Sequence, residues 1–349
     1  MPVRILFLAD THLGIDLPSR PRIKRRRRGP DFFENYERAL EPAFRGEVDC
    51  VIHGGDVLYR SKVPAALVEM AFEPLRRLAE TGVPVYVIPG NHERSFIPYP
   101  LFASHSNIHL FDRPRTYTLK KDGLTISLAG FPFVRNVRNN FTKLLDQTGY
   151  RQVRADTHIL CIHQCVEGAT VGPKDYTFRY NPDVIRAADI PGDLLAVLSG
   201  HIHRFQVLTK DLRGRPIRAP VFFSGSTERT SFAEMGEKKG YITLEICDTE
   251  AGKGDSGGSA EIGSWKFHEL PVRPMIRLEL EAGGMGRSEL QSLIRRAIKD
   301  LPDDSIVNLR ISGRLSERSM EVLRAGSLRS LVPPTLNVSL SLVDQVTKA

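Results

Sequence analysis

Short apolar runs recur along the first 250 residues, and several of them end abruptly in polar residues. Five runs have the length and the Val/Ile/Leu content of strands that are buried on both faces of a parallel sheet. They are Ile5–Ala9, Cys50–His53, Val83–Ile88, Ile159–Ile162 and Ala196–Ser199. Because Gly or polar residues follow each run, we predict that the chain turns at these points and that the polar groups lie along the sheet edge.

Helical patterns separate the first strands. Asp31 and Glu34 form a capping signal in front of an apolar stripe, and Pro64 begins a second helix. The apolar stripe of the second helix indicates a core face, with a dimer interface as the less favoured alternative. Pro74 is expected to kink or split this helix. Residues 131–150 are predicted to form a loop and a helix.

The later strands follow one another as hairpins. Residues 116–119 and 124–128 flank a Lys-Lys-Asp-Gly turn, and further strands are expected at 204–209, 217–223 and 241–247. A chain that begins as βαβ and continues as hairpins predicts an α/β sandwich of two packed sheets flanked by helices. Residues 248–263, rich in Gly, Ser and Asp, are predicted to be a mobile hairpin loop.

The composition changes near Pro271–Pro274, which predicts two domains, 1–272 and 273–349. The second domain is expected to contain three strands (276–280, 306–311, 336–342) and two helices (290–301, 316–325). Because it carries no cluster of potential ligand residues, we interpret it as a small α+β cap or substrate-guiding module.

The composition is that of an ordinary soluble globular protein, with 41% hydrophobic and 26% charged residues. No apolar run approaches the length of a membrane span. Met1–Arg4 lead directly into the first strand without a signal-peptide pattern, which predicts a cytoplasmic protein. The four cysteines lack zinc-ribbon or redox spacing and are expected to be reduced, although Cys165 lies near enough to His163 to offer a thiolate ligand as the less favoured alternative.

The net charge of +8 favours anionic partners such as nucleic acids. The densest positive run is Arg22–Arg28, for which a solvated loop and a DNA-backbone contact are both open. Its position shortly after a strand-end cluster favours phosphate contacts through Arg25, Arg26, Arg27 and Arg28.

The polar residues at the strand ends form a candidate two-metal site. The candidate ligands carry carboxylate, amide or imidazole groups: Asp10, His12, Asp56, Asn91, His163, His201 and His203. One ion would take Asp10, His12 and His203, the other Asn91, His163 and His201, with Asp56 bridging both. Nitrogen and oxygen ligands without sulfur suit manganese, iron or zinc better than calcium.

Two such cations would clamp a phosphodiester and acidify a bridging water for attack at phosphorus. His92 adjoins Asn91, yet seven other groups already fill the two sites. We therefore assign His92 to transition-state stabilisation or leaving-group protonation. We interpret His53, His105, His109, His158 and His268 as structural or surface residues.

The motifs Asp-x-His, Gly-Gly-Asp, Gly-Asn-His-Glu and Gly-His-Ile-His, with the lone His163, resemble the calcineurin-like metallophosphoesterase superfamily. Thr11–Gly14, Ser224–Arg229 and Lys239–Tyr241 are similar to its SbcD-type DNA double-strand-break repair exonuclease branch. The resemblance implies a manganese-dependent nuclease that acts on DNA ends or single strands. It also implies an SMC-like ATPase partner and a homodimer formed through helices near residues 64–80 and 95–105.

The chain departs from that branch at Tyr59, where a histidine is frequent, and at Glu93, where Asp is more usual. Two rival functions stay open. A small-substrate phosphodiesterase or phosphatase would have a closed pocket, and a non-catalytic scaffold would lack ligands that are all present here.

Overall fold

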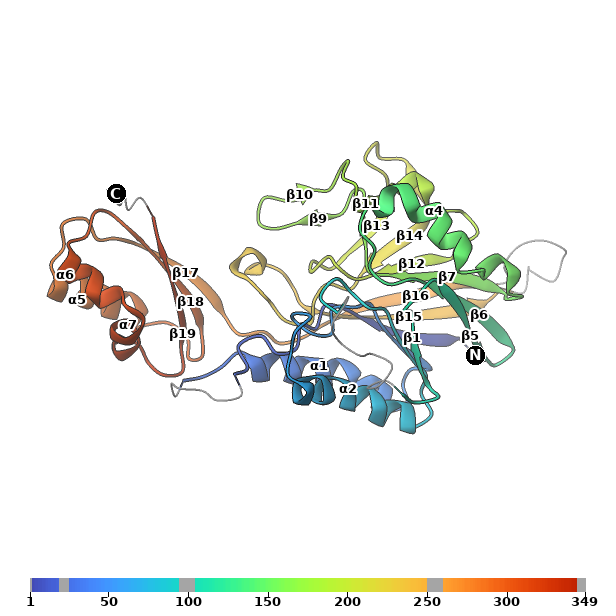
Figure 1. Cartoon of the computed structure of the whole chain (residues 1–349), viewed down its shortest axis with the longest axis horizontal. Coiled ribbons are helices and arrows are strands. Elements are labelled where there is room, and N and C mark those ends of the chain that lie inside the picture. The colour runs from blue at the N-terminus through green and yellow to red at the C-terminus, as the bar shows by residue number, and fades with distance from the viewer. Residues whose placement is uncertain (1, 19–24, 94–103, 250–259, 344–349) are drawn as a thin grey trace. The chain divides into compact units, whose positions relative to one another are not determined.

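The computed structural model describes residues 2–18, 25–93, 104–249 and 260–343 (Figure 1). The chain divides into two compact units. Unit 1 comprises Met1–Ile15 and Asp31–Pro271, and unit 2 comprises Asp16–Pro30 and Val272–Ala349. The boundary at Pro271 lies beside the one expected from sequence, but Asp16–Pro30, which we assigned to the first domain, belongs to unit 2.

The first sheet of unit 1 has six strands in the order β16-β15-β1-β2-β3-β4. Four of them, β1 (Val3–Leu8), β2 (Cys50–His53), β3 (Val85–Val87) and β4 (Ile108–Leu110), run parallel. The hairpin of β15 (Gly240–Asp248) and β16 (Ala260–Glu269) adds to β1 antiparallel. Helices α1 (Gly29–Phe44) and α2 (Ala65–Glu80) lie side by side along this sheet (Figure 1).

The second sheet also has six strands, in the order β13-β14-β12-β7-β6-β5. It consists of β5 (Arg115–Lys121), β6 (Leu124–Gly130), β7 (Thr157–Ile162), β12 (Ala196–Ser199), β13 (Gln206–Lys210) and β14 (Pro216–Phe223). Strands β6, β7, β12 and β14 run parallel, and β5 and β13 are antiparallel edges. Helix α4 (Val137–Gln147) covers its outer face.

Apolar side chains fill the space between the two sheets. Phe7 and Ile52 of the first sheet pack in one buried cluster with Leu128 and Leu198 of the second. A separate buried cluster joins the other face of the second sheet to α4 through residues such as Phe141. Because the central strands are buried on both faces, their sequences are nearly continuous apolar runs, as the sequence pattern predicted. The fold is therefore an α/β sandwich.

Short two-stranded ladders and 3-10 turns lie in the loops between the strands of unit 1. Two small ladders pair β8 (Cys165–Val166) with β11 (Val184–Ile185), and β9 (Thr170–Val171) with β10 (Tyr176–Thr177). Single 3-10 turns cover Tyr150–Gln152, Ala187–Asp189 and Phe232–Glu234.

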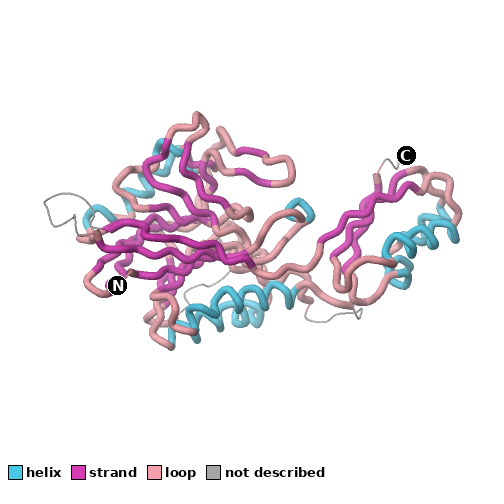
Figure 2. The backbone as a smooth tube through the Cα atoms, turned by 180° about the vertical axis from the view of Figure 1, so that it is seen from behind, coloured by secondary structure: helices cyan, strands magenta, loops and turns pink. Residues whose placement is uncertain are grey.

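Unit 2 is a three-stranded parallel sheet, β17 (Met275–Glu281), β18 (Ile306–Ser312) and β19 (Asn337–Leu342). Helices α5 (Arg287–Ile298), α6 (Glu317–Met320) and α7 (Ala325–Leu331) pack on one side of it (Figure 2). A 3-10 turn, Glu321–Leu323, joins α6 to α7. The early segment is tied to this unit, because the amide of Arg26 donates to the carbonyl of Pro334 and the side chain of Asn337 donates to the carbonyl of Arg26.

Two local expectations need correction. Of the two outcomes expected for Pro74, the split is wrong, because α2 runs without a break from Ala65 to Glu80, while the kink stays a prediction. Residues 260–263, expected in a mobile loop, begin strand β16, because β15 pairs antiparallel with Ala260, Glu261 and Ile262, with a bulge at Gly263. Residues 250–259 of that expected loop, and residues 95–103 of the helix expected near residues 95–105, lie outside the described residues.

Candidate metal centre

Each candidate ligand lies just beyond the carboxyl end of a parallel strand. Asp10 and His12 follow β1, Asp56 follows β2 and Asn91 follows β3, all in the first sheet. The second sheet supplies three more, after β7 and β12: His163, His201 and His203. The site therefore forms only when the two sheets pack together.

The backbone at the site is unusual. Four of the candidate ligands, Asp10, His12, Asp56 and His201, have positive φ angles of 53°, 45°, 51° and 78°. Non-glycine residues adopt this left-handed region at a cost of order 1 kcal/mol or more, and such residues cluster at functional sites. The turns aim the side chains out of the strand ends and toward one another.

Two glycines allow the strand-end loops to approach closely. A Cβ atom on Gly90 would lie 2.1 Å from Oδ1 of Asp56, and one on Gly55, whose φ is +102°, would lie 2.5 Å from Nδ1 of His163. Only glycine fits at these positions. The Gly-Gly-Asp and Gly-Asn-His motifs therefore have a packing reason as well as a chemical one.

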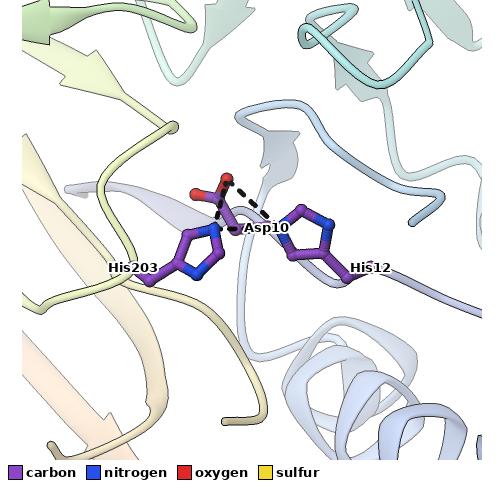
Figure 3. Close-up of side chains that lie close together, drawn as sticks. All are labelled: Asp10, His12 and His203. Carbon is purple, nitrogen blue, oxygen red and sulfur yellow. Dashed lines mark hydrogen bonds and ion pairs between the residues drawn. The ribbon is translucent and has the colours of Figure 1, made fainter. Parts of the chain in front are cut away.

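The first group consists of Asp10, His12 and His203, which point toward one another (Figure 3). The Nε2 atoms of the two histidines are 2.9 Å apart, and they lie 3.9 and 3.8 Å from Oδ1 of Asp10. Ligand atoms that share one ion at about 2.1 Å lie roughly 3.0–4.2 Å apart, depending on the angle between them, so this group fits a divalent cation. Oδ2 of Asp56 is 3.9 Å from His12 Nε2 and completes the group.

The second group combines Asp56, Asn91, His163 and His201. Asn91 Oδ1 lies 2.9 Å from His201 Nδ1 and 3.1 Å from His163 Nε2, and Asp56 Oδ2 lies 3.4 Å from His163 Nε2. These spacings also fit one cation. Since Asp56 Oδ2 borders both groups, the carboxylate is placed to bridge two ions.

His92 stands at the open side of the groups. Its side chain is 35% exposed, whereas those of His12 and His163 are nearly or fully buried. Nδ1 of His92 donates to the carbonyl of Tyr59, which directs Nε2 toward Asp56 Oδ2, 3.8 Å away. The imidazole can therefore reach a bound substrate while remaining next to the bridging carboxylate.

Burial and neighbouring charges shift the pKa values of the histidines in this cluster in opposite directions. Burial, reinforced by neighbouring imidazoles, lowers the pKa of His12 and brings that of His201 to about 3. Burial also disfavours a charged His163, but Asp56 and Asp10 outweigh it and raise its pKa to about 9. Neutral imidazoles beside carboxylates are the forms that bind divalent cations, and binding displaces the remaining protons.

A buried glutamate supports the bridging loop. Glu93 accepts hydrogen bonds from the backbone amides of Asp56 (3.0 Å), Leu58 (2.7 Å) and Gly90 (2.9 Å). Burial and the neighbouring Asp56 raise its pKa to about 8. The glutamate thus ties the loop after β2 to the loop after β3, and the longer side chain at this departure from the usual Asp has a structural use.

Sequence reasoning missed a second support. Glu234, in the 3-10 turn Phe232–Glu234, lies with its carboxylate 3.0 Å from Nδ1 of His203 and 2.6 Å from Nζ of the buried Lys239. No periodicity marks a lone glutamate in a turn, and only the fold brings it to the histidine.

The five remaining histidines make contacts with aromatic rings or backbone amides. His53, the last residue of β2, is fully buried. His109 stacks on Tyr86 with 4.8 Å between ring centroids. His268 stacks on Tyr241 at 4.8 Å, and His158 contacts Tyr150. Cys165 is buried in β8, where burial raises the pKa of its thiol well above the usual range, so it is a poor source of a thiolate ligand.

The basic run lies in unit 2. Arg25 and Arg27 both donate to Oδ1 of Asp16, at 2.9 and 3.0 Å, and Arg26 pairs with Asp304 at 3.5 Å. The amide of Arg28 donates to Asp16 Oδ2. Part of this charge is therefore already compensated within the unit, while residues 22–24 lie outside the described residues.

A model of the calcineurin-like phosphoesterase family matches residues 3–205, more than half of the chain, which spans all the candidate ligands. The chain therefore belongs to this family. It is a hydrolase of phosphoester bonds, and its buried His and Asp clusters are typical of the dimetal site of the family.

Individual relatives are distant. The DNA double-strand break repair protein Mre11 of Thermoplasma acidophilum is 25% identical over 334 residues, covering 89% of this chain and 77% of that protein. The SbcD polypeptide of the nuclease SbcCD of Bacillus subtilis is 25% identical, covering 72% and 67%. An uncharacterized metallophosphoesterase of the same organism, YhaO, is 27% identical, covering 61% and 49%. Other relatives are much longer, and the chain spans about half the length of a Methanosarcina acetivorans Mre11.

Within the described residues, no helix combines the length and apolar character that a membrane span requires.

Proposed function

We propose that the protein is a two-metal-dependent DNA repair nuclease that hydrolyses phosphodiester bonds at DNA ends or in single strands. The observation that carries the proposal is the pair of ligand groups that border Asp56, with the partly exposed His92 close to both His12 and Asp56. Support for DNA as substrate comes from the similarity to Mre11 and to the SbcD polypeptide, and from the net charge of +8.

In this proposal, Asp10, His12 and His203 hold one cation, Asn91, His163 and His201 hold the other, and Asp56 bridges them. Manganese suits this set of nitrogen and oxygen donors, as do iron and zinc. When bound, two such cations polarise the phosphoryl oxygens and lower the pKa of a water between them.

The protein contributes orientation and a proton. Asp56 is held between His163 and the amide of His92, which donates to its Oδ1 at 2.9 Å. Nε2 of His92 faces the space above Asp56. In the doubly protonated imidazolium, Nδ1–H stays on the carbonyl of Tyr59 and Nε2–H can donate a hydrogen bond to the phosphate or protonate the leaving oxygen.

Further elements of the proposal concern partners. Arg25–Arg28 would contact the DNA backbone as part of unit 2, which would act as a DNA-capping domain. An SMC-like ATPase of the SbcC type and a second copy of the chain are the proposed protein partners, since the relatives include a component of SbcCD.

The direct test is to incubate the purified protein and Asp56→Ala with manganese and three labelled substrates: single-stranded DNA, blunt duplex DNA and an aryl phosphodiester. We expect metal-dependent DNA cleavage that Asp56→Ala abolishes. Cleavage of the aryl ester without cleavage of either DNA would reject the nuclease.

A small-substrate phosphodiesterase or phosphatase of the same family is the second candidate. The ion pairs of Arg25 and Arg27 with Asp16 favour it, because paired guanidinium groups are less available to DNA phosphates. The same three-substrate comparison separates the two candidates.

A further inference from the structure

A buried carboxylate links one candidate metal ligand to a buried lysine. The side chain of Glu234 is 9% exposed and that of Lys239 is completely buried, and both lie in the segment after β14. A buried acid with a buried base is costly unless each finds enough hydrogen-bond partners. The partners of Glu234 therefore indicate what the pair does.

Four donors surround the carboxylate of Glu234. Oε1 accepts from Nδ1 of His203 at 3.0 Å and from the hydroxyl of Thr230. Oε2 lies 2.6 Å from Nζ of Lys239 and accepts from the amide of Thr230 at 3.2 Å. With both oxygens occupied, the carboxylate has one orientation.

The lysine holds the same histidine from its backbone. Nζ of Lys239 donates to the carbonyl of His203 at 2.9 Å. His203 lies in the loop after β12, outside any helix or strand. The carboxylate thus fixes the imidazole while the ammonium fixes the main chain, so the position and the ring orientation of His203 are both set.

The hydrogen bond also sets the tautomer. When Nδ1 carries the proton shared with Glu234, the lone pair of Nε2 faces the space that Asp10 and His12 border, where a cation would lie. A carboxylate partner makes an imidazole a stronger ligand than a backbone carbonyl does. In the second group, His163 has the weaker kind of partner, because its Nδ1 is 2.7 Å from the carbonyl of Gly54.

We propose that Glu234, anchored by Lys239, is a positioning residue that holds His203 in the metal-binding tautomer and strengthens one cation site of the two. This inference rests on the proposed two-metal site. It assigns the effect to the cation held by Asp10, His12 and His203, and leaves the cation held by Asn91, His163 and His201 unchanged.

Glu237 offers a matched control. Its side chain has the same 9% exposure as that of Glu234, lies 3.3 Å from Lys239 Nζ, and pairs with Arg204 at 3.1 Å. Glu237 lies three residues after Glu234 in the same segment. Its carboxylate accepts hydrogen bonds from Arg204 and Lys239, which both adjoin His203. Glu234→Gln and Glu237→Gln remove the same charge from the same buried network.

The experiment titrates Mn²⁺ into metal-free wild type and the two variants, followed by calorimetry and by the electron paramagnetic resonance of bound manganese. We expect Glu234→Gln to weaken one of the two binding events about 10–100-fold and to leave the other unchanged. Glu237→Gln should bind both ions as wild type does. Equal losses in the two variants, or no loss in Glu234→Gln, would overturn the inference.

A second variant guards against a folding defect. Thr230→Val removes one donor to Glu234, and a longer 3.4 Å contact of the same hydroxyl with Nδ1 of His203, without changing the size of the side chain. We expect a smaller loss at the same binding event, with the urea unfolding midpoint of the metal-free protein near that of wild type. Unchanged Mn²⁺ binding in Thr230→Val, together with an unfolded Glu234→Gln, would count against the inference.

These outcomes are separable from those of the proposed function. A wild type that binds two Mn²⁺ ions, shows the Glu234 effect and leaves DNA intact would reject the nuclease and keep the inference. A wild type that cleaves DNA while Glu234→Gln binds both ions normally would do the reverse.

Discussion

Asp10 is buried at the metal centre, where its ionised carboxylate destabilises the folded protein when no cation is present. Burial raises its pKa to about 6 from an ordinary 3.8, although His163 and His203 partly offset this. A carboxyl group whose pKa is higher in the folded state loses stability as the pH rises through 3.8 to 6, and the full cost is present above pH 6. Sites that bind a charged ligand commonly make the ligand-free folded state less stable.

We therefore expect Asp10→Asn to stabilise the metal-free protein at pH 8 by about 1–3 kcal/mol, since a shift of roughly two pKa units corresponds to about 3 kcal/mol. The amide oxygen keeps the hydrogen bond from the amide of His201. Urea unfolding in chelator measures the change, with the exposed turn variant Asp122→Asn as control. A less stable Asp10→Asn would contradict the prediction.

His92 is expected to act on the reaction rather than on metal binding. His92→Ala should keep both cations and lose turnover by a factor of about 10²–10⁴, the usual contribution of a positioned acid or base. Mn²⁺ titration and a cleavage assay on the same preparation measure the two effects. Full turnover in the variant would show that the assigned role is wrong.

At the scale of an element, the carboxyl end of β2 is held by a buried histidine. The amide of Gly55 donates to Nδ1 of His53 at 3.2 Å, so the proton lies on Nε2, which is 3.1 Å from the hydroxyl of Thr11. That hydroxyl donates to the carbonyl of Val57. The relay connects the loops after β1 and β2 that carry Asp10 and Asp56.

Protonation of His53 would break this relay, because Nδ1 would become a donor facing another donor. Burial lowers the pKa of His53 to about 3 from 6.5. Between pH 6.5 and 3 the unfolded chain binds a proton that the folded protein does not, so stability falls as the pH falls, by about 1.4 kcal/mol per pH unit for this group.

In His53→Gln an amide can replace the donor to Thr11 without titrating. We expect the variant to be less stable at about pH 7 but to lose stability less steeply between roughly pH 6.5 and 4.5. Urea unfolding in chelator across that range gives the slope. A slope equal to that of wild type would contradict the assignment.

At the scale of the molecule, the metal centre joins the two sheets of unit 1. The first sheet supplies Asp10, Asp56 and Asn91, and the second supplies His163 and His203. A ligand that binds only the folded state stabilises it by about 2.7 kcal/mol at roughly 100 times its dissociation constant. Unit 2 has its own apolar core and its own sheet.

Metal removal should therefore act on one unit only. We expect calorimetry to resolve two unfolding transitions, of which chelator lowers the one that belongs to unit 1 and leaves the other in place. A single transition that moves as a whole with Mn²⁺ concentration would show instead that the two units unfold together.

The basic run of unit 2 gives a prediction about DNA affinity. Arg26→Gln/Arg28→Gln should weaken binding to all sequences similarly and reduce the slope of log affinity against log salt, by up to about 0.9 for each duplex phosphate that is no longer neutralised. Arg295→Gln/Arg296→Gln, at the exposed end of α5, removes the same charge elsewhere. Equal effects of the two double variants would remove the run from the DNA path.

The sequence by itself determined most strands of the two large sheets, the two-sheet architecture and the family motifs. Continuous apolar runs encode burial on both faces, and a turn residue after each run encodes where polar groups can gather. Asp-x-His and Gly-Asn-His therefore indicated a metal chemistry before any contact was known. The local sequence pattern was less informative for two segments. The position of β16 depends on its pairing with β15, and that of Asp16–Pro30 depends on hydrogen bonds to residues near β19.

Only the tertiary structure decided how the groups combine. The spacing of Asp56 from both ligand groups, the direction of His92 and the contact of Glu234 with His203 depend on a site whose ligands lie up to 193 positions apart along the chain. Sequence pattern records which face of an element is buried. It does not record which buried acid meets which histidine, because that depends on the packing of two sheets and on turns outside them.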